Sequence, residues 1–222
     1  MYSNPPDSRW LADRYADLKR EYAFWIDQRS TPTGLQRYRW GENDDFASGY
    51  IEYLTGQRGF TFDAQTYEQR LTIGRNFLAA TESGWDFCPR FDDRQPDFLA
   101  VDLNCNLYVY EKNFAYFSTV LGMGEEGGWE AKAQERAELI NRFLWNKDRG
   151  LFLDWDYTQD RHSDVTSLAS FHPLWAGLAT PEQASRTVAN LPLFETPYGL
   201  TACAKGPRNR VYQWDYPNGW AP

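Results

Sequence analysis

The 222-residue sequence has few of the residues that mark a metal site or a disulfide framework. It contains 3 cysteines and 2 histidines, and no C-x-x-C pair occurs. Zinc sites and disulfide frameworks need clustered cysteine or histidine side chains. We therefore predict neither of them, and we expect no metal or other cofactor. The three cysteines, Cys88, Cys105 and Cys203, are expected to be reduced and buried as small apolar side chains.

Long apolar runs and an excess of positive charge are also missing. No stretch approaches the roughly 18 apolar residues of a transmembrane helix, and the first residues lack the basic region and apolar core of a secretory signal. The net charge of -8 disfavours nucleic acids and anionic membrane surfaces as partners. We expect a cytoplasmic location and neither a nucleic-acid nor a membrane partner; the sequence indicates no particular oligomeric state.

Aromatic residues are abundant instead. They make up 17% of the chain, although the mean hydropathy is only -0.69. A polar protein with so many rings either buries them with their N–H and O–H groups satisfied or lines a cleft with them. A cleft of this kind suits sugars, whose flat C–H faces stack on aromatic rings.

Hydrophobic periodicity predicts an all-α protein of consecutive helical hairpins. Apolar residues recur at spacings of three and four, which is the pattern of amphipathic helices. The expected helices cover residues 7–28, 44–54, 63–81, 103–121, 129–145, 164–179 and 181–190. Residues 151–157 alternate as in a short strand or hairpin arm, and the last thirty residues are expected to be mostly loop. No linker interrupts the chain, so we predict one domain or part of one.

The first segment that differs from a helical scaffold ends in Gly84-Trp85-Asp86-Phe87. The rings of Trp85 and Phe87 partly remove the Asp86 carboxyl from water, which favours the protonated form that a general acid needs for glycoside cleavage. The alternative is a structural aspartate that caps the next turn.

The second such segment is Gln213-Trp214-Asp215-Tyr216-Pro217-Asn218-Gly219-Trp220-Ala221-Pro222. It combines aromatic rings, amides and a carboxylate with two prolines and a glycine. Such a loop is stiff and offers hydrogen-bonding groups, so it could form the wall of a sugar pocket. The alternative is a rigid structural turn.

These two segments resemble signatures of the trehalases, glycoside hydrolase family 37. The second segment meets the pattern Q-W-D-x-P-x-G-W-x-P at every fixed position, and the first resembles the S-G-W-D-F segment that carries the family's general acid. Supporting matches occur at residues 19–25, 35–38, 101–104 and 144–150. The resemblance covers essentially the whole chain.

The resemblance implies an (α/α)6 toroid of helical hairpins and hydrolysis of α,α-trehalose to two glucoses with inversion. By position, Asp86 would be the general acid. Residues implied to line the sugar pocket are Gly84, Gln213, Trp214 and Asn218, and we expect the ring of Trp85 to face the sugar beside them.

Inversion also needs a carboxylate base, about 6.5–9.5 Å from the acid. In the family this base lies C-terminal of the Q-W-D-x-P motif, and a further signature precedes the region seen here. We therefore expect residues 1–222 to be part of a trehalase-like catalytic domain, incomplete at both ends and inactive alone. Glu42, Glu111, Asp156 and Asp215 are candidate carboxylates within the chain, but none matches the family's base.

One segment departs from the family pattern. Where trehalases usually carry an R-P-E-S stretch that binds sugar hydroxyls, this chain has a different spacing, with Arg39 and Glu42 as the candidates to take its place. Two alternatives therefore remain open. One is a related toroid α-glucosidase that acts on another glucoside or a glycosyl-glycerate, and the other is a non-catalytic sugar-binding helical domain.

Overall fold

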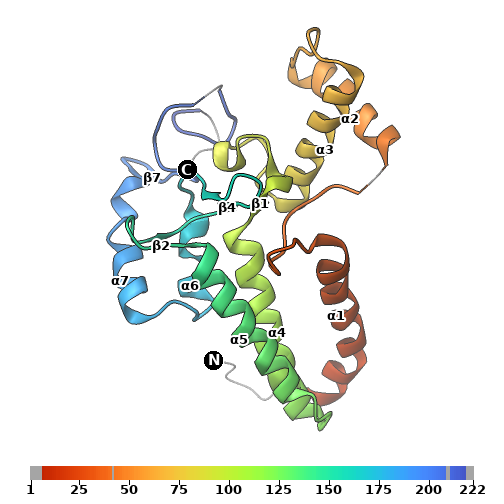
Figure 1. Ribbon diagram of the computed structural model, residues 1–222, viewed down its shortest axis with the longest axis vertical. Helices are drawn as coiled ribbons and strands as arrows, with labels where there is room; N and C mark the ends of the chain where they lie inside the picture. Colours follow the sequence, from red (N-terminus) through yellow and green to blue (C-terminus); the bar gives the residue numbers. More distant parts are fainter. Residues whose placement is uncertain (1–6, 42, 209–210, 219–222) are drawn as a thin grey trace.

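A computed structural model describes residues 7–41, 43–208 and 211–218 (Figure 1). Most of the regular structure in these ranges is helical, which confirms the predicted all-α class. The α-helices are α1 (Ser8–Arg29), α2 (Asp44–Arg58), α3 (Tyr67–Ser83), α4 (Val101–Leu121), α5 (Glu126–Phe143), α6 (His172–Trp175) and α7 (Pro181–Val188). Short 3-10 helices cover Pro89–Phe91, Gln95–Asp97, Leu168–Phe171 and Leu191–Leu193.

The strands are only two residues long and pair in three small antiparallel sheets. The sheets have the orders β1-β4-β5, β2-β3 and β6-β7. The strands are β1 (Phe98–Leu99), β2 (Trp145–Asn146), β3 (Leu151–Phe152), β4 (Trp155–Asp156), β5 (Arg161–His162), β6 (Glu195–Thr196) and β7 (Gly199–Leu200). The predicted extended stretch at 151–157 is therefore confirmed as two short strands.

Two helical pairs dominate the arrangement. Helices α4 and α5 lie side by side as a hairpin, α1 runs along the other side of α4, and α2 and α3 form a second pair at one end (Figure 1). Phe114 of α4 is 1% exposed and lies at the centre of the core between α1, α4 and α5. Its ring contacts those of Tyr15, Tyr22, Tyr110, Phe117 and Trp129.

Local capping signals explain several helix ends. The Asp7 carboxylate caps α1 by accepting hydrogen bonds from two backbone N–H groups in the first turn. Thr66 and Gln69 form a reciprocal capping box at the start of α3. Helix α4 ends at Gly122, whose φ of 64° lies in the left-handed region that glycine adopts without strain.

The prediction of a helix over residues 164–179 is wrong. Ser167 is extended and pairs with Cys203, and the N–H of Leu168 donates to the carbonyl of Ala202 at 2.9 Å. The backbone of this stretch thus bonds to the C-terminal loop, and only a 3-10 turn and the four-residue α6 remain helical. A long-range pairing has overridden the local helical pattern.

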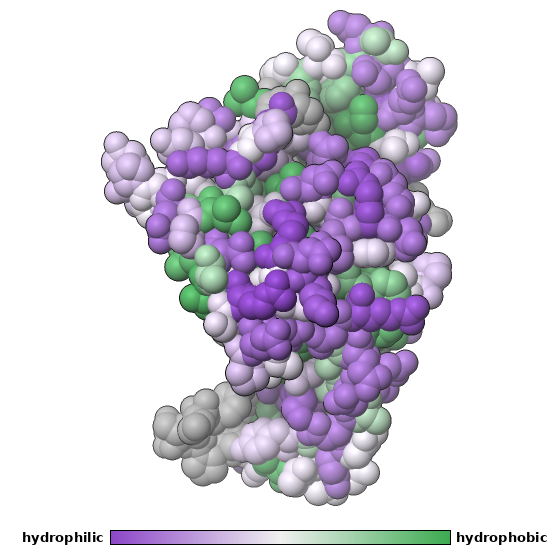
Figure 2. Space-filling model, turned by 60° about the vertical axis from the view of Figure 1, so that its left-hand side comes forward, coloured by the Kyte–Doolittle hydropathy of each residue, from purple (hydrophilic) through white to green (hydrophobic). Residues whose placement is uncertain are grey.

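The surface agrees with the polar composition. Figure 2 shows a face that is mainly hydrophilic, with small apolar patches between polar side chains. Among the helices of the described ranges, none combines the length and apolar character needed to cross a membrane.

Candidate active site

Asp86 lies in the turn that follows α3. Gly84 ends the helix with a φ of 72°, and the Trp85 N–H donates to the hydroxyl of Ser83 at 3.0 Å. On the other side of Asp86, Phe87 has a φ of 54°, which is uncommon for a residue with a side chain. Asp86 thus lies between Gly84 and Phe87, which both have positive φ, and its side chain is half-buried.

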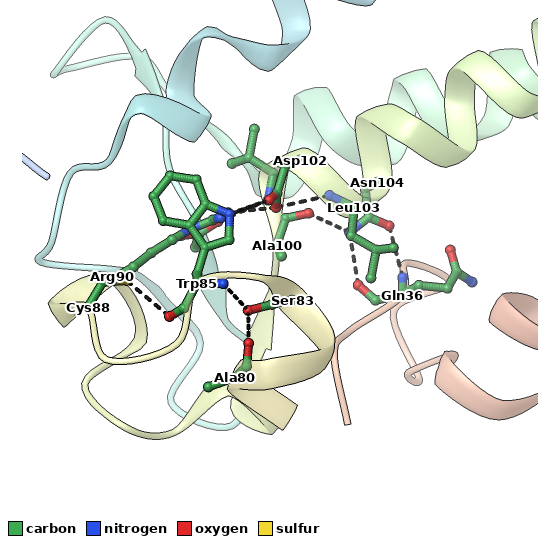
Figure 3. Close-up of polar contacts among 12 residues, drawn as sticks. Gln36, Ala80, Ser83, Trp85, Cys88, Arg90, Ala100, Asp102, Leu103 and Asn104 are labelled. Atoms are coloured by element: carbon green, nitrogen blue, oxygen red, sulfur yellow. Dashed lines mark hydrogen bonds and ion pairs between the residues drawn. The ribbon is translucent and has the colours of Figure 1, made fainter. Parts of the chain in front are cut away.

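The indole of Trp85 is directed toward Asp102 at the start of α4 (Figure 3). Its Nε1–H donates to Oδ2 of Asp102 at 2.8 Å, and the guanidinium of Arg90 lies 4.5 Å from its ring centroid. The thiol of Cys88 donates to the Trp85 carbonyl at 3.2 Å. Trp85 is therefore held at its ring and at its backbone, and the prediction that its ring faces a sugar stays untested.

A buried ionic group lies behind Trp85. Arg90 is 0% exposed and binds both Asp102 and Asp154 in bidentate fashion, with N···O distances of 2.7–2.9 Å. Burial alone would raise the pKa of the Asp102 carboxyl, but the charge and hydrogen bonds of Arg90 lower it below its usual value. Burial likewise opposes the charge of Arg90, yet the two carboxylates raise its pKa well above the usual value. Arg90 and Asp102 are therefore both charged at neutral pH.

The structure brings the two candidate segments together. The N–H of Trp214 donates to the carbonyl of Phe87 at 3.1 Å, and the Trp214 ring packs against the cluster that contains Phe77 and Phe87. Residues 87 and 214 are far apart in sequence, so this contact depends on the tertiary fold. Gln213 is half-buried in the same loop.

Two other residues stabilise the 213–218 loop from within. Asp215 is buried, and Arg208 Nε donates to its Oδ2 at 2.7 Å. The amide Nδ2 of Asn218 donates to the carbonyl of Tyr212 at 2.9 Å. In this structure Asn218 therefore supports the loop backbone. The final residues of the motif, 219–222, lie outside the described residues.

The cysteines behave as the sequence predicts, since all three are buried and free. The neighbouring thiol of Cys88, together with burial, raises the pKa of the Cys203 thiol well above its usual value. The contact is a second link between the Asp86 segment and the chain that leads into the 213–218 loop.

The backbone of Arg39 is hydrogen-bonded to Glu82 in the last turn of α3, close to Asp86 in sequence. Its N–H donates to Oε2 of Glu82 at 2.9 Å. Arg39 also lines a polar pocket of about 470 Å³ together with Trp40, Gly41, Asp44, Thr72, Arg75, Asn76 and Pro96. Its predicted counterpart, Glu42, lies outside the described residues, so the predicted pair stays a prediction.

The other candidate carboxylates are held in internal contacts. Glu111 accepts from Tyr22 and Arg136 at 2.7 and 2.8 Å, and Asp156 binds Arg94 at 2.8 Å. Asp215 is paired with Arg208, as described above. By contrast, the Asp86 carboxylate has no hydrogen bond or ion pair with any residue that the structure describes.

Within the same ranges, no group of three or more His, Cys, Asp or Glu side chains is arranged to hold a metal ion.

Comparison with known proteins identifies the family of this chain. The family model described as trehalase matches residues 2–222. The chain belongs to the trehalase family. It is 36% identical over 158 residues to the cytosolic neutral trehalase of Kluyveromyces lactis, which covers 64% of this chain and 21% of that protein. It is 37% identical over 161 residues to the probable trehalase of Eremothecium gossypii, which covers 65% of this chain and 22% of that protein.

Solved structures agree with this trehalase assignment. The neutral trehalase Nth1 from Saccharomyces cerevisiae matches with a TM-score of 0.76 and 28% identity over 97% of this chain and 46% of that chain. The GH63 mannosylglycerate hydrolase from Thermus thermophilus matches with a TM-score of 0.56 and 16% identity over 87% of this chain and 51% of that chain, which shows a shared fold alone. The helices thus belong to an (α/α)6-type toroid fold, and the chain spans less than half the length of the trehalases that it matches.

Sequence reasoning missed the ionic group of this trehalase-family chain. Asp102 lies in a segment that resembles the family, but nothing in the local sequence indicates that Arg90 is buried or that Asp154 reaches it from 64 residues away. The available signal was weak: an arginine shortly after the S-G-W-D-F segment and an aspartate between apolar residues.

Proposed function

We propose that this chain forms part of the catalytic domain of an inverting trehalase, which hydrolyses α,α-trehalose to two glucose molecules. The observation that carries the proposal is the backbone hydrogen bond from Trp214 to Phe87, because it joins the two signature segments directly beside Asp86. Family membership supports the same substrate.

Asp86 is the proposed general acid. Its half-buried carboxyl group donates a proton to the glycosidic oxygen as the bond to the anomeric carbon breaks. A second carboxylate must activate water on the opposite face of the sugar. Because Glu111, Asp156 and Asp215 are held in internal contacts, we seek this base in the part of the family's domain that the chain does not cover.

The sugar pocket is proposed to include Gly84, Trp85, Gln213, Trp214 and Asn218. The contact between the loop and the turn supports this grouping, since it joins the loop that contains Gln213, Trp214 and Asn218 to the residue after Asp86. Arg39 and Glu42 are proposed to bind sugar hydroxyls. A disaccharide is the expected ligand, and the name of the Kluyveromyces lactis relative supports a cytosolic location.

The test is the Asp86→Asn variant of the full-length protein. We expect trehalose hydrolysis to fall by about 10²–10⁴-fold, the usual contribution of general acid catalysis, without loss of folding by circular dichroism. Asp92→Asn is the matched control, because Asp92 is exposed and lies in the same turn region, and it should retain activity. Nearly full hydrolysis by a folded Asp86→Asn enzyme would rule out the assignment.

The departure at residues 39–48 favours one other candidate function, hydrolysis of a different α-glucoside or of a glycosyl-glycerate. A panel of these substrates, followed by polarimetry, distinguishes the two. A trehalase should prefer trehalose and release β-glucose from the cleaved residue.

A further inference from the structure

We propose that Arg90, clamped between Asp102 and Asp154, is a positioning residue that sets the place of the Asp86 carboxyl group through the side chain of Trp85. The proposal rests on the proposed function, because it assigns a supporting structure to the acid of that reaction.

The clamp is rigid because Arg90 is bound on both sides. Its Nη1 and Nη2 donate to Asp102 at 2.9 and 2.8 Å, and its Nε and Nη2 donate to Asp154 at 2.8 and 2.7 Å. Planar, two-pronged pairs of this type fix orientation as well as distance. A lysine could supply the charge at this position but not the two parallel bonds on either side.

Backbone N–H groups at the start of α4 also donate to both carboxyl groups of the clamp. The N–H of Val101 donates to Oδ1 of Asp154 at 2.9 Å, and the N–H of Leu103 donates to Oδ1 of Asp102 at 3.0 Å. Both donors belong to the first turn of the helix, where the backbone carries partial positive charge. The clamp is thereby anchored to the longest element of the central hairpin.

Trp85 connects the clamp to Asp86, the proposed general acid. Its indole N–H donates to the same Oδ2 of Asp102 that receives Arg90 Nη1, and the guanidinium stacks on its ring (Figure 3). Asp86 is the next residue after Trp85 in the chain, and its carboxylate has no hydrogen bond to a described residue. Its position in the absence of substrate therefore depends on its two neighbours: Trp85, which is held by the bond from its indole N–H, and Phe87, whose ring packs against Phe77.

The test compares Arg90→Lys and Asp154→Asn with the unmodified full-length enzyme. Arg90→Lys keeps the charge but loses the paired bonds. Asp154→Asn keeps the size of the side chain but loses the charged pair on one side of Arg90, so it provides a second variant if Arg90→Lys folds poorly. Arg136→Lys is the matched control, because Arg136 is also a buried arginine, 6% exposed and paired with Glu111 at 2.8 Å, but it has no contact with Trp85.

The substrates are trehalose and α-glucosyl fluoride. Cleavage of trehalose requires a proton on the departing sugar oxygen, whereas fluoride leaves as a stable anion without one. We expect both variants to lose kcat on trehalose by about 10²-fold, the effect of a misplacement near 1 Å, with KM little changed. Hydrolysis of α-glucosyl fluoride should be largely retained, and Arg136→Lys should retain activity on both substrates.

Equal losses on both substrates would show that the clamp has a general structural role, and unchanged trehalose hydrolysis in folded variants would show that Asp86 does not depend on it. Either result overturns the proposal while leaving the proposed function intact. If the unmodified enzyme hydrolyses neither substrate, the proposed function itself fails.

Discussion

Replacing Asn104 with alanine should destabilise the protein far more than the same change two residues later in α4. Asn104 is 0% exposed and ties the chain after α1 to α4 (Figure 3). Its Oδ1 accepts from the Gln36 N–H, and its Nδ2 donates to the Gln36 carbonyl, both at 2.9 Å. Gln36 is 2% exposed, so water cannot replace these bonds.

The magnitude follows from the two stranded backbone groups. A buried donor or acceptor left without a partner costs about 1–3 kcal/mol, which gives about 2–6 kcal/mol for the N–H and the carbonyl of Gln36. The better helix propensity of alanine offsets about 0.5 kcal/mol of this. The carbonyl of Ala100 adds little, because the N–H of Asn104 still donates to it. We expect a net loss of about 2–5 kcal/mol.

Urea unfolding of the full-length protein, followed by circular dichroism, measures this loss. Asn106→Ala is the matched control, because the Asn106 side chain is half-buried and has no hydrogen bond with another described residue; it should change the free energy of unfolding by less than about 0.5 kcal/mol. If Asn104→Ala and Asn106→Ala differed by less than about 1 kcal/mol, the reasoning from stranded backbone groups would be refuted.

Three further variants test the core, the 213–218 loop and the acid response. Phe114→Ala should lower the free energy of unfolding by about 3–5 kcal/mol, because it empties the centre of the aromatic cluster; Phe24→Ala, at a ring that is 41% exposed, should change it little in the same titration. Arg208→Met should cost about 3–5 kcal/mol by leaving the buried carboxylate of Asp215 unpaired, and adding Asp215→Asn should recover part of the melting temperature; no recovery would contradict the pairing. Burial by itself raises the pKa of Asp156, but hydrogen bonds to its carboxylate hold that pKa below the usual value. The stability it contributes is therefore complete above about pH 4 and is lost as the pH falls through the lower folded value. Asp156→Asn should show a smaller loss of stability over this acidic range, and equal losses in both proteins would count against the role of Asp156.

The main helices were predictable because their signals are local. The alternating steps of three and four apolar residues that predict a helix over 103–121 are confirmed by α4, and Gly122 ends it with a left-handed φ. The helix predicted over 7–28 is confirmed by α1, which Asp7 caps through its own carboxylate. Predicted boundaries at the other helices shift by a few residues, since fraying and caps such as the Thr66 capping box decide the last turn.

The helix predicted over 164–179 shows that local sequence patterns cannot predict pairing with a distant segment. Its residues have acceptable helical periodicity, but Ser167 and Leu168 bond to the backbone near Cys203 instead. No window of sequence around these residues contains their partners. The same limit applies to Arg90, since its burial depends on the approach of Asp154.

The sequence by itself determined the helical elements, the lack of a metal-binding pattern and the two segments that carry the trehalase signatures. These features depend on residues within a few turns of one another. Only the tertiary structure decided that Trp214 meets Phe87 and that Arg90 lies between Asp102 and Asp154 behind Trp85. Hydrogen bonds and ion pairs between distant segments form only after the packed helices have brought those segments together. The surroundings of Asp86 could therefore be identified only from the tertiary structure.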